Sequence, residues 1–132
     1  PLRRQRQMCI RDRNEGIAHY VGHDPLIRWG NMTAEEATTF QVNSAIYTGE
    51  ADVPLESLEG PGNAAQLWPG HIGYIAVEKL VADSPEGPLS LRSICEAIAG
   101  GATVDDAFQN AFGISKSDFY EDFPPYFDTL RP

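Results

Sequence analysis

The sequence predicts a mainly α-helical fold, and three kinds of observation lead to that prediction. Apolar residues recur at intervals of three and four in several segments, which is the spacing of one face of a helix. Threonine or serine precedes several of these segments as a possible cap, and glycine or proline follows most of them. No segment reads as a β-strand. We therefore expect helices that pack around a single core.

The first 13 residues are expected to be foreign to this fold. Residues 3–12, RRQRQMCIRD, resemble the translation of an adapter used in sequencing libraries, and Arg13 would span the junction. We therefore expect the native N-terminus to be missing and natural sequence to begin near Asn14. Residues 1–13 should be disordered or non-native and should pack against nothing. Residues 14–132 remain, enough for one modest core.

The charge balance argues against nucleic-acid binding. Of ten basic and 19 acidic residues, five and one respectively lie in residues 1–13, which leaves residues 14–132 with a net charge of −13. A phosphate-binding surface needs clustered Lys and Arg, and residues 14–132 contain no such cluster.

No run of about 18 apolar residues predicts a membrane segment. Cys95 stands in an apolar stretch and is expected to be a small core residue, without a disulfide framework.

Two helices are expected in the first third of the chain. Residues 15–21 are interpreted as the end of a helix that begins upstream, and Gly22 with Asp24-Pro25 is expected to stop it. A second helix should begin at Thr33, because Thr33-Ala34-Glu35-Glu36 is a capping box, and should reach about Tyr47.

A long irregular connection, residues 48–69, is expected to follow. It contains three prolines and three glycines and cannot sustain a helix, so we interpret it as a surface crossing. Connections of this length are usually functional or mobile. A third helix is expected over residues 72–81, apolar on most sides, with Ser84-Pro85 at its end.

Three further helices are expected in the C-terminal third. One covers residues 89–99, the next is capped by Thr103 and ends at Gly113, and the last is capped by Ser115 and closed by Pro124-Pro125. The core should hold both tryptophans and the phenylalanines of the last two helices, which are Trp29, Trp68, Phe108, Phe112, Phe119 and Phe123.

The segment Glu15-Gly16-Ile17-Ala18-His19-Tyr20 resembles the third-ligand helix of the peptidase MA-like zinc metallopeptidases, the gluzincin group. In that family an upstream HExxH helix supplies two histidines and a general-base glutamate, and a glutamate in a Glu-Gly-x-Ala-x-Tyr segment completes the zinc site. The resemblance implies that Glu15 is a metal ligand. Three protein ligands leave zinc a fourth position for an activated water. Taken alone, Glu15 is more simply an ordinary first-turn carboxylate that the helix dipole favours.

The order of later segments extends this resemblance over nearly all of residues 14–132. It continues through PLESLE at 54–59 and the helix at 72–80, and then through GATVDDAF, FGIS and FYEDF, with which such domains commonly end. The resemblance implies that the chain is the helical C-terminal subdomain of a zincin-like metallopeptidase, truncated at the N-terminus.

His71 and Tyr74 are candidates for a second role in such a site. Peptidases of this type need a donor for the oxyanion that forms when zinc-bound hydroxide attacks the peptide carbonyl, usually a Tyr or His on a later helix. The resemblance does not decide which of the two serves, if either does. The alternative is that Tyr74 packs with its hydroxyl at the rim of the core and His71 is solvated.

The sequence itself contains no HExxH motif. His19 and His23 have Tyr20 where the catalytic glutamate would be needed, so exposed or capping histidines are expected there. Glu15, His19 and His23 could in principle bind a metal from one helix face, but Gly22 is expected to end the helix first.

We therefore expect a fragment of a zinc-dependent peptidase that hydrolyses peptide bonds with metal-activated water. The intact parent would bind zinc and a peptide or protein substrate, whereas the fragment, without HExxH, should be inactive and should hold no zinc tightly. The alternatives are an inactive relative and a non-catalytic helical module that binds a protein partner. An HExxH motif a few tens of residues upstream of Glu15 would decide for the peptidase. The compartment remains open.

Overall fold

The computed structural model describes residues 14–58 and 70–132, and every regular element within these two ranges is helical. The mainly helical fold is thereby confirmed for this part of the chain. Residues 1–13, Trp68 and the second half of the 48–69 connection lie outside the described residues. The elements are α2 (Asn14–Arg28), α3 (Ala34–Tyr47), η1 (Glu50–Asp52), η2 (Leu55–Leu58), α5 (Gly70–Asp83), α6 (Leu89–Ala99), α7 (Val104–Phe112) and α8 (Lys116–Leu130).

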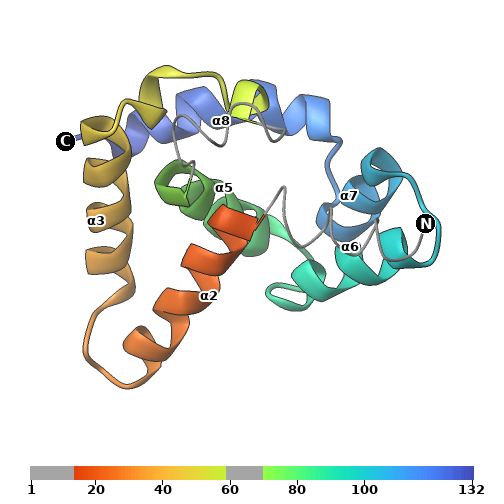
Figure 1. Ribbon diagram of the computed structural model, residues 1–132, viewed down its shortest axis with the longest axis horizontal. Coiled ribbons are helices and arrows are strands. Elements are labelled where there is room, and N and C mark those ends of the chain that lie inside the picture. Colours follow the sequence, from red (N-terminus) through yellow and green to blue (C-terminus); the bar gives the residue numbers. More distant parts are fainter. Residues whose placement is uncertain (1–13, 59–69) are drawn as a thin grey trace.

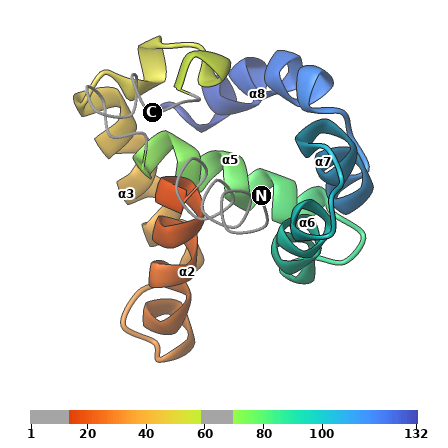
Figure 2. The same ribbon diagram turned by 45° about the vertical axis from the view of Figure 1, so that its right-hand side comes forward.

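Helix α5 is the centre of the arrangement. It contacts α2, α3, α7 and η1, and its contact with α2 is the most extensive between any two elements. In Figure 1, α2 and α3 lie toward one end of α5 and α6 and α7 toward the other, while α8 runs along the top of the view. The 45° turn of Figure 2 preserves this order. Near the end of α8, Arg131 donates to the backbone carbonyl of Ala51 in η1 over 3.3 Å.

The C-terminal helices pack through a row of aromatic rings. Phe119, Phe123 and Phe127 recur at four-residue spacing on α8 and are all buried. The Phe119 ring lies 6.0 Å from that of Phe108 on α7, between ring centroids. The predicted core position of the α7 and α8 phenylalanines is confirmed. That of Trp29 is wrong: this residue is 77% exposed, just past α2, whose C-terminal end projects beyond α5 in both views.

Two helices continue through prolines that were expected to end them. α2 contains Pro25 and runs to Arg28, and α8 contains Pro124 and Pro125 and runs to Leu130. Proline removes one backbone N–H and disturbs the preceding turn. Packing on both sides of the proline offsets that cost, because α2 lies against α5 and the buried face of α8 continues past its prolines.

Helix α2 ends instead at a glycine in the left-handed conformation. Gly30 has φ 75° and donates its N–H to Ile27 over 3.1 Å, while Asn31 donates to Leu26 over 3.0 Å. This pair of bonds is a Schellman motif, which satisfies carbonyls at the end of a helix. The sequence prediction took Gly22 as the stop, eight residues too early.

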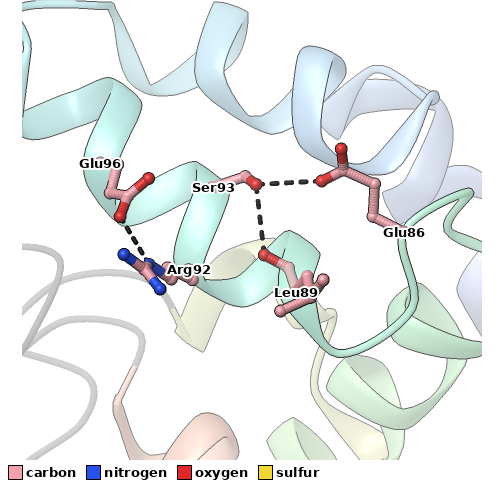
Figure 3. A network of polar contacts seen from close by, with 5 residues as sticks. All are labelled: Glu86, Leu89, Arg92, Ser93 and Glu96. Carbon is pink, nitrogen blue, oxygen red and sulfur yellow. Dashed lines mark hydrogen bonds and ion pairs between the residues drawn. The ribbon is translucent and has the colours of Figure 1, made fainter.

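The predicted helix caps are confirmed. Thr33 and Glu36 form both bonds of the capping box, and Thr103 and Ser115 each accept from the backbone N–H three residues on. α6 begins and ends where the sequence predicts. Its outer face carries polar pairs: Ser93 donates to the Glu86 carboxylate over 3.0 Å, and Arg92 pairs with Glu96 over 2.6 Å (Figure 3).

Three smaller observations complete the fold. The described part of the 48–69 connection holds the two 3₁₀ turns η1 and η2, where only irregular chain was expected. Cys95 packs half-buried against the core as expected, but it is disulfide-bonded, which its sequence context did not predict. No helix within residues 14–58 and 70–132 has the length and apolar character needed to cross a membrane.

Candidate functional site

The residues singled out from the sequence lie on two helices that pack together. Glu15 lies in the first turn of α2, and its side chain, like that of His19, is outside the described part. His71 is the second residue of α5 and is half-buried, and Tyr74 follows one turn later with 1% exposure. Since α2 lies along α5, the helix of Glu15 and the helix of His71 and Tyr74 are neighbours. The implied role of Glu15 as a metal ligand stays a prediction.

A hydrogen-bonded chain joins α2, α3 and α5 through one buried amide. Gln41 on α3 is completely buried. Its Nε2 lies 2.8 Å from Nε2 of His23 on α2, and its Oε1 lies 2.7 Å from Nδ1 of His71 on α5. The expectation that His23 is an exposed or capping residue is wrong, because α2 continues past Gly22 and carries His23 to the surface of α3.

A buried carboxylate holds the first turn of α5. Glu50 in η1 is completely buried, and its Oε1 accepts from the backbone N–H of His71 over 3.1 Å and from that of Ile72 over 3.4 Å. Its other oxygen accepts from the Thr48 hydroxyl. The first N–H groups of a helix have no partner within the helix and carry partial positive charge, so a carboxylate is well suited to this place. Glu50 thereby fixes the backbone from which the His71 ring projects.

A second polar group lies further along α5. Glu78 accepts from the Thr38 hydroxyl of α3 over 2.8 Å. Burial raises the pKa of the Glu78 carboxyl, and the hydroxyls of Thr38 and Tyr74 oppose that rise. Burial, and then the Glu78 charge, raises the pKa of the Tyr74 hydroxyl. Tyr74 therefore stays protonated.

Aromatic rings surround the histidines. The His23 ring meets the Tyr74 ring edge-on at 5.2 Å between centroids. The ring of Phe40 lies 6.3 Å from that of His23 and 6.2 Å from that of His71, although Phe40 is 53% exposed. The histidines thus lie between a polar interior contact at Gln41 and an aromatic side chain that reaches the surface.

The sequence did not single out three of these residues. Gln41 could have been noticed, because it interrupts the stripe of Ala37 and Ala45 at four-residue spacing on α3. Glu78 likewise lies seven residues after His71 on α5. No sequence pattern around Glu50 predicts that it is buried, because its contact with α5 joins residues 21 positions apart.

This arrangement can position imidazole nitrogens and exchange protons through them. Within residues 14–58 and 70–132, no three His, Cys, Asp or Glu side chains gather into a group that could hold a metal ion. The described side chains alone therefore do not form a zinc centre. Comparison of the chain with family models, with curated proteins and with solved structures finds no match in any of the three.

Proposed function

We propose that this chain is the C-terminal helical part of a zinc-dependent peptidase, with Glu15 as one of the metal ligands. The proposal rests first on the resemblance of Glu15 to Tyr20 and of the later segments to gluzincin peptidases. The sequence motif alone would be weak, because a glutamate in the first turn of a helix is common.

One structural observation carries the proposal further. The helix that begins with the Glu15 segment packs along α5, and His23 of that helix is linked through Gln41 to His71 at the start of α5. A ligand helix and a helix that supplies a group for the reacting carbonyl need to be neighbours in such a peptidase. The packing of α2 on α5 supports that relation between the two segments.

Of the two candidate oxyanion donors, the geometry favours His71. Tyr74 is only 1% exposed, so its hydroxyl is poorly placed to reach a substrate. His71 is half-buried, stands at the end of α5 and uses its Nδ1 in the contact with Gln41. The proposal therefore assigns His71, rather than Tyr74, to the substrate side.

The remaining parts of the zinc site would come from the upstream half of the parent. The side chains of residues 14–58 and 70–132 supply no metal-binding group by themselves. The proposal assigns the two histidine ligands and the general base to an HExxH helix upstream, and to this chain one ligand and the residues around His71.

The test compares the parent protein, with its upstream half restored, with two variants. Wild-type parent should contain zinc and cleave an unstructured protein in a chelator-sensitive way. Glu15→Ala should lose zinc and activity together, whereas Glu35→Ala, an exposed first-turn glutamate of α3, should lose neither. If Glu15→Ala keeps full zinc content and rate, Glu15 is not a ligand.

A non-catalytic module that binds a protein partner is the second candidate, and exposed apolar side chains favour it. Val21 and Leu26 of α2 and the following Trp29 are exposed. Exposed apolar side chains on one helix can contribute to a contact surface. An upstream sequence without HExxH, and a parent without zinc, would favour this candidate over the peptidase.

A further inference from the structure

We propose that Gln41 is a positioning residue that holds His23 and His71 in the same tautomer, with the proton of each neutral ring on Nδ1. The observation behind this inference is the pair of short contacts at the two ends of one buried amide. The two ends differ chemically, since the amide oxygen only accepts hydrogen bonds and the NH₂ group only donates them.

Each contact fixes the state of the ring that it touches. The NH₂ of Gln41 faces Nε2 of His23 at 2.8 Å, so this nitrogen must accept and a neutral His23 carries its proton on Nδ1. Nδ1 of His23 is buried and no described residue accepts a hydrogen bond from it, so the contact with Gln41 has to outweigh the cost of that N–H. The amide oxygen faces Nδ1 of His71 at 2.7 Å, so this nitrogen must donate. The neutral His71 ring therefore has its lone pair on Nε2.

One amide orientation thus sets both rings. If the amide were turned by 180°, its oxygen would face His23 Nε2 and its NH₂ would face His71 Nδ1. Both neutral rings would then carry the proton on Nε2. A mixed pair, with one ring in each tautomer, leaves two donors or two acceptors facing each other at one end of Gln41, which is costly in a buried place.

Neighbouring groups restrict the position of the His71 ring and keep it in contact with Gln41. Glu50 fixes the backbone of His71 by accepting from its N–H and from that of Ile72. The Phe40 ring lies within 6.3 Å of both histidine rings, between centroids. Gln41 itself is completely buried, so water does not compete for its amide.

The consequence for catalysis rests on the proposed peptidase function. A neutral His71 held in this way has its lone pair, and not its proton, on Nε2. It could donate from Nε2 to an oxyanion only in the doubly protonated, cationic form. Gln41 thereby decides whether the neutral ring acts as an acceptor or as a donor.

The experiment is ¹⁵N NMR of the histidine rings in the whole 132-residue chain, at a pH alkaline enough for the rings to be neutral. Single His→Gln changes at residues 19, 23 and 71 assign the three rings. Two-bond nitrogen–proton couplings then show which nitrogen of each ring carries the proton. The expected result is the Nδ1–H form for both His23 and His71.

Two substitutions of Gln41 sharpen the test, with Gln109→Met on the exposed face of α7 as the matched control. Gln41→Met removes donor and acceptor, and both rings should relax to mixtures of tautomers. Gln41→Glu can only accept when ionised, so His71 should stay Nδ1–H while His23 changes to Nε2–H. Gln109→Met should leave both rings as in the wild type.

The proposal is overturned if both wild-type rings are Nε2–H, if they differ from each other, or if Gln41→Met leaves them unchanged while the chain remains folded by circular dichroism. These outcomes are independent of zinc and of peptide cleavage. An inactive parent would therefore remove the peptidase proposal and leave the tautomer assignment standing, and the converse also holds.

Discussion

The interior of the C-terminal half, between α7 and α8, is filled by the rings of Phe108, Phe119 and Phe123. In the N-terminal half, where α2, α3 and η1 meet the start of α5, the completely buried side chains include the polar Gln41 and Glu50. The C-terminal half is thus held by ring packing, with centroid distances of 5.7 Å between Phe119 and Phe123 and 6.0 Å between Phe108 and Phe119. The N-terminal half holds hydrogen-bonded polar groups in its interior.

The difference shows what each half requires of its sequence. Apolar packing depends on size and spacing, and many sequences meet those requirements. A buried polar group must find its partner, because a buried donor or acceptor left without one costs about 1–3 kcal/mol. The N-terminal half therefore depends on Gln41 and Glu50 keeping their particular hydrogen-bond partners. This half also carries the candidate functional residues.

The largest expected effect is in the aromatic half. Phe123→Ala should lower the free energy of unfolding by about 3–5 kcal/mol, because it removes a buried ring and leaves a cavity between Phe119 and Phe127. Leu89→Ala, at an exposed position of α6, should cost well under about 1 kcal/mol. Urea unfolding followed by circular dichroism measures both. Equal small losses would mean that ring packing does not hold this half together.

The next effect concerns the buried carboxylate of the polar half. Glu50→Ala should cost about 2–3 kcal/mol, because it leaves the N–H groups of His71 and Ile72 without an acceptor. Glu50→Gln should cost less, since its amide oxygen can still accept from them. The same unfolding measurement applies, with exposed Glu35→Ala as the control. A loss at Glu50→Ala no greater than at Glu35→Ala would argue against the role of Glu50 as the cap of α5.

A gain in stability is expected at a proline. Pro124→Ala should raise the free energy of unfolding by about 1 kcal/mol, because it restores a backbone N–H in the interior of α8 at an exposed position. Pro88→Ala should give no such gain, since Pro88 is the N-cap of α6, where no intrahelical N–H is lost. Thermal unfolding of the two variants decides, and a destabilised Pro124→Ala would contradict the explanation given for α8.

The smallest effect is a pH dependence that arises at Glu78. Burial raises the pKa of this carboxyl above its ordinary value of 4.5, so the folded state holds the proton more tightly than the unfolded chain does. The stability that protonated Glu78 contributes is present below pH 4.5 and is lost as the pH rises through its folded pKa. Glu78→Gln should therefore flatten the stability curve over this interval. An unchanged curve would mean that Glu78 does not titrate differently on folding.

The sequence predicted most of the fold wherever local chemistry determines it. Thr33, Thr103 and Ser115 cap their helices as expected, because a cap depends only on the residues of one turn. The extents of α2 and α8 were underestimated at Pro25 and at Pro124-Pro125, because tertiary packing outweighs the local preference of proline.

The interior of the N-terminal half could not be predicted in the same way. The pairing of Gln41 with His23 and His71 joins residues 18 and 30 positions apart, and no local pattern encodes that contact. The bond from Glu50 to the start of α5 likewise depends on the path of the chain between two helices. The family resemblance alone points to His71 and Tyr74. The structure shows that His71 is half-buried and Tyr74 is buried, a difference that depends on how α5 packs.

The most direct test of the central claim, that the N-terminal half is the functional half, is made in the zinc peptidase that the proposal takes as the parent of this chain. The measurement is the rate of peptide cleavage at equal zinc content and equal folded fraction, for His71→Ala and for Tyr120→Ala, a half-buried aromatic residue of α8. His71→Ala should lower the rate about a hundredfold, the size of effect typical of a lost proton-transfer or oxyanion-stabilising group, and Tyr120→Ala should leave the rate unchanged. Equal rates for the two variants would contradict the claim.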